Sequence, residues 1–432
     1  MIECFYALGG LNYKNGVIST CPRQADQLVF TDETILPSEI YNHKNFKNLR
    51  SKLYNNQWPS GCDTCADMER DGLKSMRQDF SLLDNWFCKL GDKDKIEKSD
   101  VNLMSLYDEK THEVDFRGLR HVEIRFSNAC NFACLHCSKV FSTGWAKKIQ
   151  NYVPDTEVIQ NDLKQLMGTE HRHGSDDKSE MQLSTEDALK IVEDLNENFP
   201  NIEFIDFAGG ELLYQKQFIP TLKKLADHPN AKNILISFHT NFNADFSVDE
   251  LSAALKPFKE SCIIISIDAG QKIYSYFRHG GTWEKLKQNI HDFKKINTFT
   301  HVDISCTTSI YQILEIEDVF KSFYELDCNM DASIVQTPKY VNPSIIMYDF
   351  EKETLKDLRK TEDFIMKNLG PEKYDFKKWF DYISNYVNRT RLEYRHYNRW
   401  LVYRKKSDEI WQQNFNDHFQ NYQIDDGELV RA

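Results

Sequence analysis

The sequence predicts an α/β fold built on a parallel sheet. Between residues 119 and 335, short apolar and β-branched runs alternate with longer segments whose apolar residues recur at helical spacing. Repeated strand–helix units form parallel sheets, either open or closed into a barrel. In addition, the polar motifs of this region directly follow the predicted strands, as expected for a site at the carboxyl end of such a sheet.

Each element of this region has its own signal. A first helix should begin after Ser184, because Asp187 completes a capping-box signature. A second helix is indicated by apolar residues at the same spacing from Trp283 to Phe293. The predicted strands are His121–Ser127, Phe204–Ala208, Ile234–His239, Ile263–Asp268 and Val302–Thr307.

Composition divides the chain into four segments. Residues 1–75 have few periodic segments but four cysteines, which suggests a small metal-braced module. Residues 76–118 are polar and mixed and are interpreted as a helical connector, residues 119–335 as the strand–helix region, and residues 336–432 as a helical ending. The polar stretch 151–180 contains His171 and His173, for which an insertion loop is favoured over a metal site.

Charge and cysteine content exclude several classes of protein. The 432 residues have a formal net charge of −12, which argues against a nucleic-acid partner. No apolar run approaches the ~18 residues of a membrane helix, and the start of the chain lacks a signal-peptide pattern. We therefore expect a cytoplasmic protein without a membrane partner. The 11 cysteines are an odd number and are partly clustered, which favours metal binding over disulfides.

The first cysteine group is Cys130, Cys134 and Cys137, a C-x3-C-x2-C run directly after a predicted strand. Thiolates are soft ligands that suit iron–sulfur clusters or zinc. Three thiolates leave one iron of a four-iron cluster open, and a small molecule with an amine and a carboxylate can chelate it. A zinc site completed by His136 and plain buried thiols are the alternatives, and the x3 spacing counts against zinc.

This cysteine run, with His136 before its last cysteine, resembles the signature of the radical S-adenosylmethionine (SAM) superfamily. The resemblance covers about residues 119–335 and implies a partial (β/α)6 TIM-like barrel. Two positions depart from the family pattern, because Leu212 stands where proline is frequent and Phe242 where glycine is expected. Four further segments resemble family motifs in the same order: FAGGELL at 207–213, SFHTNFN at 237–243, IISIDAG at 264–270 and YFRHGGTWEKLKQNI at 276–290.

The resemblance implies a catalytic [4Fe-4S] cluster on Cys130, Cys134 and Cys137, with SAM at its open iron. It also implies an electron donor such as flavodoxin or ferredoxin, and reductive cleavage of SAM to a 5′-deoxyadenosyl radical that abstracts a hydrogen from the substrate. Taken singly, each motif also fits an ordinary turn or helix start. The implied cofactor contacts are His136, Gly209, Gly210, Glu211, Thr240, Asn241, Ser266, Asp268 and Arg278.

The second cysteine group is Cys4, Cys21, Cys62 and Cys65, with Gly16 placed between the first two. Its C-x11-G-x4-C opening resembles the SPASM/twitch modules of radical SAM enzymes, in the arrangement with an N-terminal twitch domain. This resemblance implies an auxiliary [4Fe-4S] cluster for electron transfer. Four thiolates saturate such a cluster, but they also satisfy tetrahedral zinc, so both metals stay open here.

Cys306 and the basic stretch 386–406 each have a structural and a functional interpretation. Cys306 lies near the end of a predicted strand and is a candidate hydrogen donor to a substrate radical, although core packing is the default for the isolated cysteines. In the basic stretch 386–406, Arg391, Arg395 and Arg399 are expected on one helix face. Packing of this helix on the barrel is favoured over recognition of a phosphate, a carboxylate or RNA.

These features predict a radical SAM oxidoreductase or mutase that acts on a peptide, an amino acid or a sugar-like metabolite. The alternatives are a superfamily member that modifies RNA or a nucleotide, and a zinc-bound interaction protein without catalysis.

Overall fold

The computed structural model describes residues 1–14, 16–22, 24, 28–30, 34–70, 72, 75–78, 102–137, 141–151, 182–335, 339–368 and 374–432. The insertion loop expected at 151–180, with His171 and His173, therefore lies outside the described residues except for its first residue. Much of the predicted connector 76–118, including Cys88, also lies outside them.

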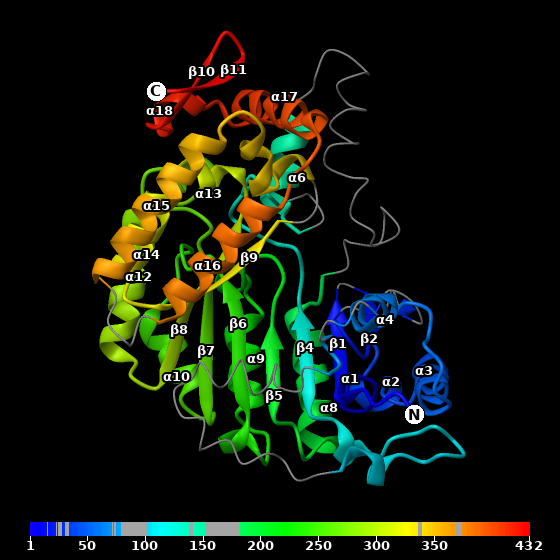
Figure 1. The fold of residues 1–432 in the computed structure, drawn as a ribbon. Coiled ribbons are helices and arrows are strands. Elements are labelled where there is room, and N and C mark those ends of the chain that lie inside the picture. Colours follow the sequence, from blue (N-terminus) through cyan, green and yellow to red (C-terminus); the bar gives the residue numbers. More distant parts are fainter. Residues whose placement is uncertain are drawn as a thin grey trace.

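A nine-stranded sheet in the order β3-β2-β1-β4-β5-β6-β7-β8-β9 forms the centre of the molecule (Figure 1). β1 and β4 to β9 run parallel, whereas β2 and β3 extend the β1 edge in antiparallel pairing. The strands are β1 (Gly10–Lys14), β2 (Val17–Ser19), β3 (Val29–Phe30), β4 (His121–Arg125), β5 (Phe204–Phe207), β6 (Leu235–Thr240), β7 (Glu260–Ser266), β8 (Thr300–Thr308) and β9 (Asn329–Ile334).

The predicted α/β fold is confirmed, since β4 to β8 lie close to the five predicted strands. The sequence did not indicate β1, which comes from the N-terminal segment and pairs with β4. The cysteine-rich segment is therefore continuous with the main sheet.

The helices that follow the strands share one hydrophobic core with one face of the sheet. Ser184 accepts a hydrogen bond from the Asp187 amide (3.0 Å) and begins α8, so the predicted cap is confirmed. Thr282 begins the second predicted helix, α12, whose predicted apolar face is buried. These helices are α8 (Thr185–Asn198), α9 (Phe218–Leu225), α10 (Val248–Leu255), α11 (Tyr274–Phe277), α12 (Trp283–Ile296), α13 (Ile310–Leu314) and α14 (Ile316–Glu325). The helix after β4, α6 (Thr143–Asn151), packs in a separate small apolar cluster through Trp145.

The two ends of the chain lie at different parts of the sheet (Figure 1). The N-terminal helices α1 (Phe5–Gly9), α2 (Pro37–Ile40), α3 (Lys44–Tyr54) and α4 (Asp63–Arg70) lie beside the β1 edge. The predicted helical C-terminal region is confirmed and ends in a hairpin. Its elements are α15 (Glu351–Asn368), α16 (Tyr374–Arg389), α17 (Tyr394–Trp411), α18 (Phe415–His418), β10 (Tyr422–Asp425) and β11 (Glu428–Arg431).

One detail of the C-terminal prediction is wrong. Because α17 begins only at Tyr394, Arg391 precedes it and does not share a helix face with Arg395 and Arg399.

Within the described residues, no helix combines the length and the apolar composition that crossing a membrane requires.

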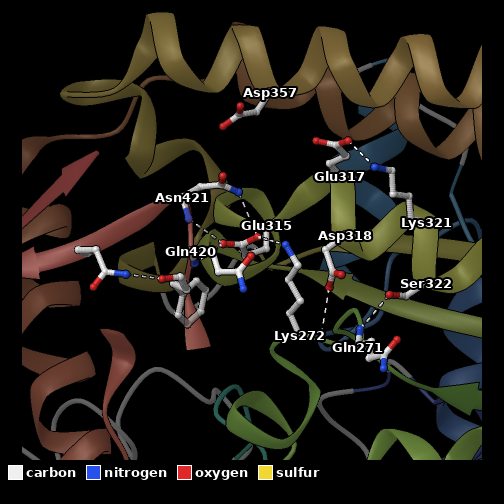
Figure 2. Close-up of polar contacts among 12 residues, drawn as sticks. Gln271, Lys272, Glu315, Glu317, Asp318, Lys321, Ser322, Asp357, Gln420 and Asn421 are labelled. Carbon is white, nitrogen blue, oxygen red and sulfur yellow. Dashed lines mark hydrogen bonds and ion pairs between the residues drawn. The ribbon is translucent and has the colours of Figure 1, made fainter. Parts of the chain in front are cut away.

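Glu315, between α13 and α14, attaches the C-terminal segment to the sheet domain (Figure 2). Its Oε1 accepts hydrogen bonds from the backbone amides of Gln420 (2.9 Å) and Asn421 (3.2 Å). Its Oε2 accepts one from Asn421 Nδ2 (3.1 Å), and Lys272 Nζ lies 3.8 Å from the same oxygen. Glu315 is buried, and its carboxylate accepts three hydrogen bonds that hold the C-terminal segment against the sheet domain.

Replacing Glu315 with alanine should lower the free energy of unfolding of the full chain by about 2–4 kcal/mol, because it removes a buried carboxylate that accepts three hydrogen bonds from Gln420 and Asn421. Chemical denaturation measures this value. Glu317→Ala is the matched control, since Glu317 forms an exposed pair with Lys321 at 2.6 Å (Figure 2) and should contribute less than about 0.5 kcal/mol. Equal losses in both variants would contradict the anchoring role.

Candidate active site

The three clustered cysteines lie on the loop that joins β4 to α6. Cys134 is buried, and Cys130 and Cys137 are partly buried. Two backbone hydrogen bonds fix the loop to the segment after α11, since the Ala133 amide donates to His279 O (3.0 Å) and the Leu135 amide to Phe277 O (2.9 Å). The loop that bears all three thiols is thus held against the segment that contains Arg278.

Helix α17 covers this loop from the C-terminal side. Tyr403 donates a hydrogen bond to the Leu135 carbonyl, and Trp145 Nε1 donates to the Cys134 carbonyl at 2.6 Å. The rings of Trp145 and Trp411 meet edge to face at 4.7 Å. Ala133, Trp145, Ile410 and Trp411 form a small apolar cluster against which Cys137 packs. The predicted packing of the basic helix on the barrel agrees with this position, but no pattern in the sequence indicated that the helix contacts the cysteine loop.

Glu211, the acid of the Gly-Gly-Glu motif, is the centre of a second group. Its Oε1 accepts hydrogen bonds from Thr240 Oγ1 (2.5 Å) and the Leu213 amide (3.0 Å), and its Oε2 accepts one from the Asn241 amide (2.5 Å). Burial raises the pKa of Glu211, and these hydrogen bonds oppose that shift. Asn241 Nδ2 also donates to Asn131 Oδ1 (2.8 Å). The group therefore connects the end of β6 to the cysteine loop.

The two glycines before Glu211 have conformations that favour glycine. Gly209 and Gly210 have φ of 90° and 55°, and a Cβ at Gly210 would lie 2.3 Å from the Ala129 carbonyl oxygen. Phe242, which replaces a family glycine, has a φ of 52°. This turn thus holds a bulky residue in the left-handed region, at a cost in strain.

Asp268, His136 and Arg278 form a third group beyond the end of β7. Asp268 accepts hydrogen bonds from Arg278 and from the Thr307 amide (2.6 Å), and His136 Nε2 lies 3.4 Å from it. Burial lowers the pKa of Arg278, but the charge of Asp268, together with Cys134, Tyr274 and the hydrogen bond to Asp268, raises this pKa above its ordinary value. Burial also lowers the pKa of His136, which favours its neutral form.

The remaining two predicted residues lie on opposite faces of the sheet. Ser266 ends β7 and is partly exposed on the face opposite the helices. Cys306 is 1% exposed and belongs to the hydrophobic core between sheet and helices. This position argues against the predicted role of Cys306 as a hydrogen donor.

The four N-terminal cysteines line a single cavity. Cys4, Cys21, Cys62 and Cys65 are joined there by Tyr6 and other residues of α1, α3 and the loops around them. Burial raises the pKa of Cys4 to about 11 and that of Cys62 to about 12, so both thiols are protonated in the free protein.

Both cysteine groups are donor sets that suit iron–sulfur clusters. Thiolates are soft ligands, and in a cluster each cysteine binds its own iron. Three thiols on one loop fit a cluster with one open iron, and four thiols around one cavity fit a fully ligated cluster.

Known proteins resemble this chain in sequence family and fold. Residues 124–318 match the profile of the radical SAM superfamily. No curated protein matches the chain. Among solved structures, anSMEcpe with bound AdoMet is 16% identical with a TM-score of 0.34, and the match covers 55% of this chain and 62% of that one. The chain thus spans less than two thirds of anSMEcpe.

A second solved protein is matched over more of the chain. Streptococcus suis SuiB is 13% identical with a TM-score of 0.35, over 87% of this chain and 68% of that one. SuiB bound to its precursor peptide SuiA is 12% identical with a TM-score of 0.34, over 88% and 69%. The family match itself extends from β4 to α14 and includes the cysteine loop and both polar groups beside it. Residues 124–318 therefore form a radical SAM domain.

Proposed function

We propose that this chain is an enzyme that uses SAM to abstract a hydrogen atom from a peptide, an amino acid or a sugar-like metabolite. The observation that supports this proposal best is the cysteine loop after β4, which is held next to Arg278 by the backbone hydrogen bonds of Ala133 and Leu135. A reduced [4Fe-4S] cluster, when bound, supplies the electron that cleaves SAM to a 5′-deoxyadenosyl radical.

The chain's own residues have distinct proposed roles around these cofactors. Cys130, Cys134 and Cys137 would hold the cluster, and the cover formed by α17 buries part of their loop. Glu211 and Arg278 would orient SAM, because both are buried charged groups in fixed hydrogen-bond networks. The other proposed contacts around SAM are His136, Gly209, Gly210, Thr240, Asn241, Ser266 and Asp268.

We infer that the N-terminal cavity holds an auxiliary [4Fe-4S] cluster. Four thiols line this cavity, and four thiolates leave no iron open for a substrate. Such a cluster suits electron transfer. An external electron donor such as flavodoxin or ferredoxin would reduce the cluster on Cys130, Cys134 and Cys137, which we call the barrel cluster.

The contacts of the basic segment count against modification of RNA. Arg391 pairs with Glu351 (2.8 Å), Arg395 with Glu393 (3.0 Å) and Arg404 with Asp408 (2.7 Å). These carboxylates compete with phosphates for the same guanidinium groups. RNA binding that weakens steeply with salt would revive this alternative.

The direct test of the proposed function is formation of 5′-deoxyadenosine. The full chain is purified without oxygen, reconstituted with iron and sulfide, reduced with dithionite and supplied with SAM. We expect 5′-deoxyadenosine and methionine in equal amounts, measured by chromatography. A reconstituted protein that contains iron and sulfide but forms neither product would refute the proposal.

Glu211→Gln should weaken SAM binding about ten- to a hundredfold. A carboxamide has one acceptor oxygen and an NH2 group, so it cannot accept from Thr240 and Asn241 together, and its NH2 group would face one of the two donors. Equilibrium binding of SAM to the reconstituted protein measures the effect.

Glu193→Gln is the matched control, because Glu193 is exposed on α8 and pairs only with Lys224, at 3.1 Å. It should leave SAM affinity unchanged. Equal affinities of parent and Glu211→Gln would mean that the Gly-Gly-Glu motif does not serve this cofactor.

A further inference from the structure

The face of the sheet opposite the helices carries polar side chains, some of which are accessible. On β5 to β8, Asp206, His239, Ser266 and Ser305 are partly exposed on this face. The residues between them point to the helices and belong to the hydrophobic core, for example Ile205, Phe238 and Ile304. A ligand can therefore reach this inner face beside these four side chains.

One row of this inner face crosses from the N-terminal segment into the radical SAM domain. The strand register pairs Asn12 of β1 with Glu123 of β4, Glu123 with Asp206 of β5, and Asp206 with Ser237 of β6. Neighbouring strands lie about 4.8 Å apart, so Asn12 and Asp206 are separated by about 10 Å.

The row contains buried polar atoms without partners. Asn12 is 0% exposed, and neither its Nδ2 nor its Oδ1 has a hydrogen-bond partner within the described structure. The same is true of Asp206 Oδ1. A buried amide with both its donor and its acceptor unused is costly, so these atoms indicate a ligand that completes the row.

Charges of both signs lie around the row. Arg125 Nε donates to Glu123 Oε1 at 2.6 Å, and the register places Lys14 beside Arg125. Burial and then the Glu123 charge raise the pKa of Asp206 to about 8, and burial lowers that of His239 to about 4. Near neutral pH, the row thus has one carboxylate, one carboxylic acid and two neighbouring cations.

We propose that Asn12, Glu123 and Asp206 form a subsite that binds an uncharged amide group of the substrate. The inference deepens the proposed function, on which it rests for the identity of the ligand as substrate. An amide offers one N–H donor and one C=O acceptor, which match the unused acceptor and donor of Asn12. Lys14 and Arg125 disfavour an ammonium group, and Glu123 disfavours a carboxylate.

Amide groups occur in Asn and Gln side chains and in the peptide backbone, and two small probe molecules distinguish these two sources. Acetamide represents the side-chain amide of Asn or Gln, and N-methylacetamide represents a backbone amide. Methylammonium and acetate are the charged controls of similar size. Each probe is titrated onto the full chain, and binding is measured by ligand-observed NMR. Affinities on the order of 1–100 mM are expected for ligands this small.

Asn12→Leu should weaken binding of the tighter amide about three- to tenfold. It should also raise the melting temperature, because an apolar side chain of similar size replaces an unpartnered polar one. Asn329→Leu is the matched control, since Asn329 lies on the same face at the far strand β9, and it should leave amide affinity unchanged. If Asn12→Leu does not fold, Asn12→Ala should show the same loss of affinity.

Several outcomes would overturn the subsite. These are no amide binding by the parent, equal amide affinity in the Asn12 variant, or tighter binding of acetate or methylammonium than of either amide. Formation of 5′-deoxyadenosine is measured on the same preparations. A parent that forms this product but binds no amide refutes the subsite alone, whereas amide binding without the product refutes the proposed function alone.

Discussion

Replacing Cys130, Cys134 and Cys137 together with alanine should abolish 5′-deoxyadenosine formation and lower bound iron from about eight to about four per chain. No other described cysteine lies on this loop, so the variant has no substitute ligand for the barrel cluster. The four cysteines of the N-terminal cavity are unchanged and should retain their own iron. Iron and sulfide analysis after anaerobic reconstitution, together with product chromatography, measures both effects.

The matched control is Cys328→Ala. Cys328 is buried in the hydrophobic core, so its loss tests whether removal of any buried thiol has the same effect. This variant should keep its iron and form 5′-deoxyadenosine at the parent rate. A triple variant that still forms the product at that rate would show that the barrel cluster is wrongly assigned.

The strands were predictable where apolar residues formed continuous runs. Ile263–Ile265 of β7 lies in such a run, and its predicted position agrees with the structure. β1 was not predictable in the same way, because its sequence GLNYK contains glycine, asparagine and lysine, which are poor strand formers. It is stabilised by pairing with β4, which lies about a hundred residues later in the chain. Local patterns do not contain that information.

The candidate site likewise combines features that the sequence predicts with features that it does not. The sequence motifs identified Glu211, Thr240 and Asn241, and the structure brings them together. The contacts of Tyr403 and Trp411 with the cysteine loop join residues more than 250 positions apart, so spacing along the chain could not reveal them. The burial of Cys306 agrees with the default expectation for an isolated cysteine, but the face of the strand on which it lies was not predictable, because a one-residue change of register moves a strand residue to the other face.

The N-terminal segment contributes to two neighbouring features of the molecule. Through β1 it places Asn12 and Lys14 on the inner face of the sheet, and through α1 it places Tyr6 beside the four-cysteine cavity. The Tyr6 ring also packs edge to face against His121 of β4, with 5.6 Å between the ring centroids. The cavity and the main sheet are therefore in contact through Tyr6.

A variant with Cys62→Ala and Cys65→Ala should separate the proposed electron-transfer cluster from a structural zinc site. If the cavity holds a fully ligated cluster for electron transfer, the variant should lose about four irons and still cleave SAM with dithionite. That reaction requires only the residues of the barrel. The variant should fail in complete turnover of the substrate, in which an electron must leave or return.

A zinc site predicts a different result for the same two proteins. The parent would contain about four irons and one zinc, and the variant would keep its iron but unfold at a lower denaturant concentration, because structural zinc contributes folding energy. Metal analysis of the parent after iron reconstitution is compared with that of the variant. Because β1 pairs with β4, the measurement uses the full chain. Zinc in the parent, with unchanged iron in the variant, would refute electron transfer through this cavity and leave the barrel assignment intact.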